Sequence, residues 1–187
     1  MEKMTFGEKQ ERVMVSGNGK VVVLLNEREV ENAPSDGEVA DGGTHWEYDA
    51  VWLDTGGAKD EASLVRAAKA KLLEDIDAWD KGGEVNAFVV NGEDAWLDKG
   101  TRVGLMNSAT IAKGAGQTEV PLWLNDKSFS VKPDTLTSML SNVEIYAMMC
   151  YNKTAEHKAA VESLENVEDI CGYDYKEGYP EKLVINL

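Results

Sequence analysis

The chain has 187 residues, of which 43% are hydrophobic and 28% are charged, and this composition argues against disorder over its whole length. Its 34 acidic and 19 basic residues give a net charge of −15, which argues against binding to nucleic acid or to an anionic membrane surface. We interpret the acidity as a solvated surface that keeps the protein dissolved, with mimicry of DNA at a basic site as the alternative.

Neither the N-terminus nor any apolar run carries a signal for export or membrane insertion. Residues 1–12 are rich in charge, and the run at 21–25 is too short to span a bilayer. Cys150 and Cys171 form neither a disulfide framework nor a metal-binding spacing. We therefore expect a soluble protein with reduced thiols, located in the cytoplasm during expression.

The N-terminal part is predicted to be rich in β-structure. The runs at 9–15 and 20–26 contain Val and Leu and flank a Ser-Gly-Asn-Gly turn at 16–19, which predicts a hairpin. The polar stretch 27–43 is predicted to be a loop with at most a short structured piece. Apolar residues then alternate over 44–53, as in a half-buried strand.

The pair Gly56-Gly57 marks the expected end of this first segment, and from Asp60 the apolar period becomes helical. That helix is predicted to end at Gly82-Gly83. Strands at 85–90 and 93–97 follow, joined by an Asn-Gly pair that suits a two-residue type I′ turn.

Asp98 is predicted to cap a helix over 99–113, and Pro121 indicates that the short strand at 120–124 lies at a sheet edge. Pro133 opens the strongest helix of the chain, which either continues or gives way to a second helix near Thr154. Its inward stripe is predicted to consist of Leu136, Met139, Leu140, Val143, Tyr146, Ala147 and Cys150.

Asn166 is predicted to cap a short final helix over 167–171, and the tail 173–187 is expected to pack back on the body. The whole pattern predicts an α+β fold. A small β-rich segment (1–57) precedes a helical domain (58–187) that contains a β-hairpin and a short edge strand.

Several motifs in the second domain carry a resemblance to a known family. They are residues 85–99, Arg102, Tyr146, His157, Ala160, Leu164, Tyr173-Asp174-Tyr175 and Gly178-Tyr179-Pro180. Together, over about residues 60–183, they resemble a domain family of unknown function found in tail-associated proteins of bacteriophages and prophages, with many members in Bacteroides-type bacteria. The resemblance implies a tail-fibre or tail-assembly setting, and it implies no catalytic residue.

His157 is one of two histidines and the best single candidate for catalysis. A catalytic base needs an orienting partner and a pocket, and the sequence shows neither. We therefore expect a structural histidine that hydrogen-bonds the tail between Tyr173 and Tyr179.

Tryptophans are the other candidates, since the chain contains five. Core packing is their default role, but Trp46, Trp52 and the Tyr179 region would form a platform for sugar rings or a partner protein if exposed together. The candidate interaction or structural residues are Trp46, Trp52, Trp96, Arg102, His157, Asp174 and Tyr179.

No metal, cofactor or catalytic site is predicted. The acids at 75, 77, 80 and 84 are similar to a calcium loop, but the glycine at 82 is out of register. The Gly-rich stretches at 17–20 and 113–118 lack the pattern of a phosphate-binding loop.

The expected function is that of a non-enzymatic structural or assembly protein of a phage tail. It would contact other tail proteins or copies of itself, with the β-rich segment pairing through exposed strand edges. One alternative is a module that binds carbohydrate or a small ligand through exposed tryptophans, and another is an enzyme centred on His157.

Overall fold

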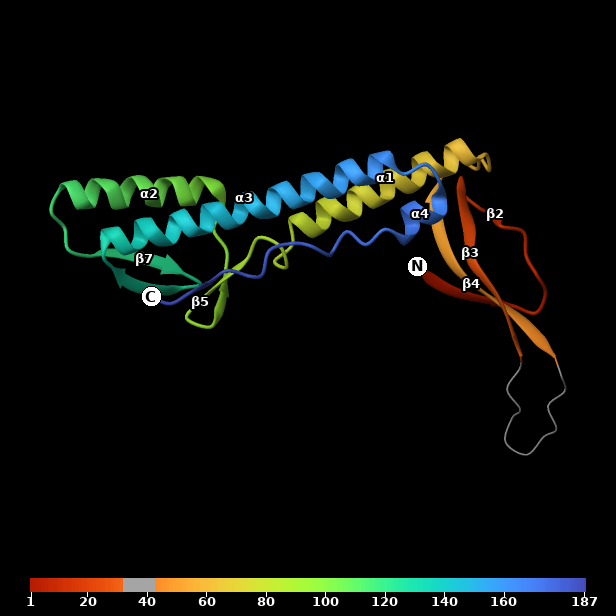
Figure 1. Cartoon of the computed structure of the whole chain (residues 1–187), viewed down its shortest axis with the longest axis horizontal. Coiled ribbons are helices and arrows are strands. Elements are labelled where there is room, and N and C mark those ends of the chain that lie inside the picture. Colours follow the sequence, from red (N-terminus) through yellow and green to blue (C-terminus); the bar gives the residue numbers. More distant parts are fainter. Residues whose placement is uncertain (32–42) are drawn as a thin grey trace, which may run out of the picture. The chain divides into compact units, whose positions relative to one another are not determined.

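A computed structural model describes residues 1–31 and 43–187, which divide into two compact units (Figure 1). Unit 1 is drawn from Met1–Glu74 and Ala160–Tyr173, and unit 2 from Asp75–Ala159 and Asp174–Leu187. Strands and helices both occur, with strands first and a helical body after them, which confirms the α+β class. This division falls within two helices, after Glu74 and after Ala159, and just beyond a third, after Tyr173, whereas the expected boundary at 57–58 stays a prediction.

Four strands of the described part of unit 1 form an antiparallel sheet in the order β1-β4-β3-β2. Their bounds are β1 Glu2–Phe6, β2 Val13–Ser16, β3 Lys20–Glu31 and β4 Thr44–Asp54. The predicted hairpin (β2 and β3) and the predicted strand (β4) are confirmed. Strand β1 was missed because its five residues are half polar, and its conformation depends on pairing with the distant β4.

Residues 27–31, at the start of the stretch predicted as a loop with at most a short structured piece, form the end of β3, and residues 32–42 lie outside the described residues. A bulge lets the strand continue. The register with β4 shifts between Leu25 and Arg28, where Asn26 adopts a φ of 52°, a left-handed conformation that Asn tolerates. Pairing with β4 overrides the polar composition that suggested a loop.

One face of this sheet carries a small apolar cluster of Val22, Leu24, Tyr48 and Ala50, with Met4, Phe6, Met14 and Trp46 at its edge. The connection between β1 and β2 contributes contacts to it. The backbone N–H of Gln10 donates to the Tyr48 hydroxyl at 3.0 Å, and the Lys9 ammonium lies 5.0 Å from the Trp46 ring centroid.

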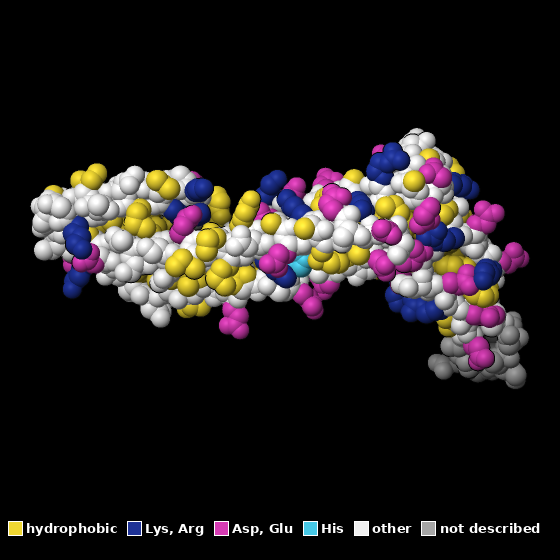
Figure 2. Space-filling view, turned by 45° about the horizontal axis from the view of Figure 1, so that its top comes forward, with side chains coloured by type: hydrophobic (Ala, Val, Ile, Leu, Met, Phe, Trp, Pro, Cys, Tyr) yellow, Lys and Arg dark blue, Asp and Glu magenta, His cyan; other side chains and the backbone are white. Residues whose placement is uncertain are grey.

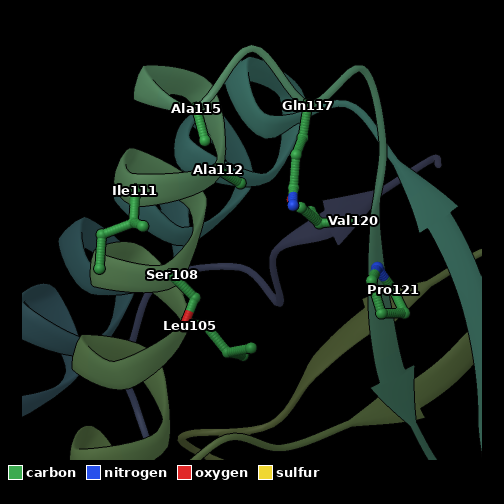
Figure 3. Close-up of a pocket in the computed structure, with 8 residues that line it drawn as sticks. All are labelled: Leu105, Ser108, Ile111, Ala112, Ala115, Gln117, Val120 and Pro121. Atoms are coloured by element: carbon green, nitrogen blue, oxygen red, sulfur yellow. The ribbon is translucent and has the colours of Figure 1, made fainter.

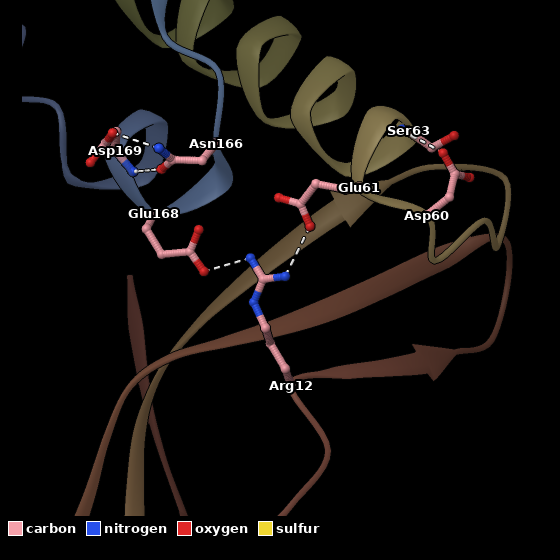
Figure 4. Close-up of polar contacts among 7 residues, drawn as sticks. All are labelled: Arg12, Asp60, Glu61, Ser63, Asn166, Glu168 and Asp169. Carbon is pink, nitrogen blue, oxygen red and sulfur yellow. Dashed lines mark hydrogen bonds and ion pairs between the residues drawn. The ribbon is translucent and has the colours of Figure 1, made fainter.

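Arg12 joins three segments of unit 1 that are far apart in sequence (Figure 4). Its guanidinium donates to Glu61 of α1 (Glu61–Asp80) at 2.9 Å and to Glu168 of α4 (Val167–Gly172) at 2.5 Å. The bond from Arg12 holds the pKa of Glu61 below its usual value. Nearby, Asp60 accepts from the Ser63 N–H and Asn166 from the Asp169 N–H, so both helix starts are capped.

Unit 2 is described throughout and contains the remaining elements. They are β5 Phe88–Val90, β6 Glu93–Ala95, α2 Lys99–Gly114, β7 Val120–Leu124, β8 Lys127–Val131, most of α3 (Pro133–Ser163) and β9 Val184–Ile185. Strands β6, β5 and β9 form one sheet, in which β9 runs parallel to β5 and fixes the tail, as predicted. Strands β7 and β8 form a separate hairpin.

Several local predictions for this region are confirmed. Asn91 and Gly92 have φ angles of 50° and 84°, as a type I′ turn requires, and Asp98 accepts from the Thr101 N–H at 2.9 Å. Helix α3 is one continuous helix of 31 residues, which resolves the open alternative at Thr154. Strand β8 was missed because its sequence is short and polar. It pairs with β7, to which the turn at Asn125-Asp126 connects it.

The core of unit 2 forms between the inward face of α3 and the strands. Buried residues from every layer meet there: Phe88, Val90, Ala95, Leu97, Ala109, Leu122, Leu124, Val131, Leu136, Met139, Leu140 and Val143. Of the predicted inward stripe of α3, all residues except the half-buried Ala147 are buried. The helical period therefore identified the core face correctly.

Strand β7 offers a matched test of this core, since Leu122 is fully buried whereas the next residue, Trp123, is 66% exposed. We expect Leu122→Ala to lower the free energy of unfolding by about 2–5 kcal/mol, because it leaves a cavity. Trp123→Ala should change it by less than about 0.5 kcal/mol. Urea unfolding followed by circular dichroism measures both, and equal effects would contradict the assigned core.

Candidate interaction surface

The outward side of α3 in unit 2 carries large apolar side chains. Ile145, Met148, Met149 and Tyr151 are 54%, 55%, 49% and 70% exposed, and we call these four residues the apolar stripe. Ile145, Met148 and Met149 are three and four positions apart, so they share one helix face, with Tyr151 beside it. Tyr146 and Cys150, on the opposite side, are buried.

Few charged residues lie along this part of α3. Among residues 135–155, all of which the structure describes, the charged residues are the exposed Glu144 and the half-buried Lys153, which pairs with Glu156 at 3.2 Å. The Arg102 Nε donates to Glu144 Oε2 at 2.8 Å, which neutralises it. Figure 2 shows hydrophobic side chains gathered over this part of unit 2 with few charged groups between them.

Arg102, which was predicted as an interaction residue together with Trp96, contacts α3 at Glu144, the residue before Ile145 of the apolar stripe. Besides Glu144, Arg102 donates from Nη1 to the Leu97 carbonyl at 2.7 Å, so its side chain, 14% exposed, joins α3 to the start of α2. Trp96 is 60% exposed. Trp96 and Ile145 are each one residue from a group that Arg102 holds.

His157 contacts the tail, as predicted. It is 4% exposed, its Nε2 lies 2.9 Å from the Glu177 carbonyl oxygen, and its ring centroid lies 5.5 Å from that of Tyr179. Tyr179 also shares a hydrogen bond of 3.0 Å with Thr154, which donates to Asp80 at 2.7 Å. These bonds give His157 and Tyr179 a structural role in fixing the tail.

A second pair of bonds from α3 ends on the Val85 carbonyl. The Tyr146 hydroxyl donates to it at 2.7 Å and the Cys150 thiol lies 3.2 Å from it. Burial, together with the neighbouring Cys150, raises the pKa of Tyr146 to about 12, and burial also raises the pKa of the Cys150 thiol. A thiol whose pKa is raised is a poor nucleophile, so Cys150 is not suited to covalent catalysis.

The other predicted residues form no shared site. Trp46 and Trp52 are six residues apart on β4, about 20 Å along an extended strand. Tyr48 and Ala50, which lie between them on the same face, are 2% and 1% exposed, so the two rings share no continuous exposed surface. Asp174 accepts from the Lys176 N–H at 2.9 Å, a local turn contact.

The acids that are similar to a calcium loop make other contacts. Asp77 pairs with Lys158, which lowers the pKa of Asp77, and Asp80 accepts from Thr154. Within the described residues, no group of three or more His, Cys, Asp or Glu side chains is arranged to hold a metal ion.

A groove of about 400 Å³ lies between the end of α2 and the start of β7 in unit 2 (Figure 3). It is lined by Leu105, Ser108, Ile111, Ala112, Ala115, Gln117, Val120 and Pro121. None of these side chains titrates near neutral pH, so this groove has no acid, base or nucleophile of ordinary catalytic strength. It is suited to receiving an apolar group.

Comparisons with known proteins give no match: no family model, curated protein or solved structure is similar to this chain. The resemblance to tail-associated phage proteins therefore stays a prediction. None of the described helices is long and apolar enough to cross a membrane.

Gly178 tests the attachment of the tail, because its φ is +78° and a Cβ there would lie 2.6 Å from the Lys153 Cε. We expect Gly178→Ala to lower the free energy of unfolding of unit 2 by about 1–2 kcal/mol. The control is Gly104→Ala in α2, where a Cβ has open space. That change should stabilise by about 0.5–1 kcal/mol in urea unfolding, and effects of the same sign would contradict the assignment.

The raised pKa of Tyr146 leads us to expect that the protein loses stability at high pH. In the unfolded chain its hydroxyl ionises near pH 10, whereas the folded protein retains the proton to about pH 12. This contribution to stability is fully present below pH 10 and falls as the pH rises from 10 to 12. Chemical unfolding at several pH values should show a shallower fall for Tyr146→Phe, and identical slopes would contradict the assignment.

Proposed function

We propose that the protein is a non-enzymatic structural or assembly protein that acts through protein–protein contacts made by the outward face of α3. The observation that carries this proposal is the apolar stripe, because large apolar patches on a protein surface mark interaction sites. Methionines suit such a surface, since their flexible side chains adapt to a partner.

The polar chemistry of the described residues supports the same proposal. The best catalytic candidate, His157, is buried and bonded to the backbone of the tail, and Arg102 and Asp174 make intramolecular contacts. The groove beside α2 adds apolar surface without a titratable group. These side chains stabilise the fold, and the apolar stripe remains as the surface with a partner still to be assigned.

A phage or prophage tail is the setting that we propose, and the motifs within residues 60–183 support it. In that setting the protein would contact tail proteins during assembly or within the particle.

Affinity capture from lysates of induced prophage-carrying cells tests this proposal. We expect the wild-type chain to retain tail proteins and the double variant Met148→Glu, Met149→Glu to lose at least ten-fold of that signal, because two buried charges would disrupt the contact. Trp123→Glu places the same charge at an exposed position of β7 (66% exposed), outside both the apolar stripe and the groove, and is the control. Equal capture by all three chains, or no tail protein with any of them, would contradict the proposal.

A further inference from the structure

We infer that the occupant of the apolar stripe is a second copy of this chain, with α3 packed against α3 of the copy in a two-fold symmetric dimer. The inference rests on the proposed function, since it takes the outward face of α3 as the contact surface. It adds the identity of the partner and the geometry of the interface.

Charge favours a copy at this face. Each chain carries a net charge of −15, so two copies repel each other over most orientations. Around the apolar stripe Glu144 is neutralised by Arg102, and copies that meet there bring no unpaired like charges together. A basic partner would instead be drawn to acidic surface, which the stripe does not offer.

The area is sufficient for a dimer. Taking roughly 200 Å² for each of the four side chains, their exposed fractions give about 450 Å² of apolar surface per copy, or about 900 Å² for two. Ser141, Asn142 and Asn152, which are exposed and uncharged on the same face, extend it. The apolar area alone is close to the roughly 1,000 Å² that a specific interface needs, and these polar residues add to it.

In the inferred dimer the two-fold axis passes near Met148 and Met149, because these residues lie at the centre of the apolar stripe that meets its own copy. In a two-fold interface the same patch meets itself, so an antiparallel α3 pair brings Ile145 opposite Asn152 of the partner subunit. The small side chains of Ser141 and Asn142 allow the helices to approach, and the methionines fill the space between them.

Sedimentation velocity over a concentration series of the full chain tests the inference. We expect a wild-type dimer, a monomer for the double variant Met148→Glu, Met149→Glu, and a dimer for Trp123→Glu. We also expect dimerisation to strengthen as NaCl rises from about 0.05 to 0.5 M, because salt screens repulsion between the acidic copies. A wild-type monomer at all concentrations would overturn the dimer, whereas tail-protein capture that depends on the stripe would still support the proposed function.

A disulfide test covers the case in which the charged variants fail to fold. In a Cys171→Ser background, Met148→Cys near the axis should cross-link on mild oxidation and give a covalent dimer. Ser138→Cys is the control, because its two copies would lie roughly 30 Å apart at 1.5 Å rise per residue. Equal cross-linking of the two variants, or none with Met148→Cys, would overturn the inferred axis.

Discussion

Burial of the inward face of α3 is the interaction on which unit 2 depends. Leu136, Met139, Leu140 and Val143 come from this helix, and they meet buried residues of β5, β7, β8 and α2 in one cluster. The strands are short and could not be stable alone, so their pairing relies on the apolar surface that α3 supplies. The opposite face of the same helix is exposed at Ile145, Met148, Met149 and Tyr151.

Polar groups on α3 extend this constraint to the tail. The hydroxyl of Tyr146 satisfies the Val85 carbonyl, Thr154 bonds Asp80, and His157 bonds the carbonyl of Glu177. Buried polar atoms must find partners, and these bonds join α3 to the loop at Val85, to the end of α1 and to the tail. A histidine that appears catalytic in isolation is thus used to hold the C-terminal segment.

The outward face of α3 carries little net charge although the chain as a whole is acidic. An acidic chain remains dissolved because its copies repel, yet a protein that assembles needs one surface where repulsion is absent. Pairing of Arg102 with Glu144 provides such a surface beside Ile145, Met148, Met149 and Tyr151. The proposed assembly role and the inferred dimer both depend on this local neutrality.

Local sequence signals determined the turn at Asn91-Gly92, the cap at Asp98 and the inward stripe of α3, because turn geometry, capping and helical period act within a few residues. The sequence also indicated that His157 would bond the tail. Only the tertiary structure decided that residues 27–31, β1 and β8 are strands, since their pairing energy comes from other strands. The apolar stripe could have been found as the apolar residues left outside the inward face, but its exposure depends on which neighbours cover α3, and that is decided by packing across the whole unit.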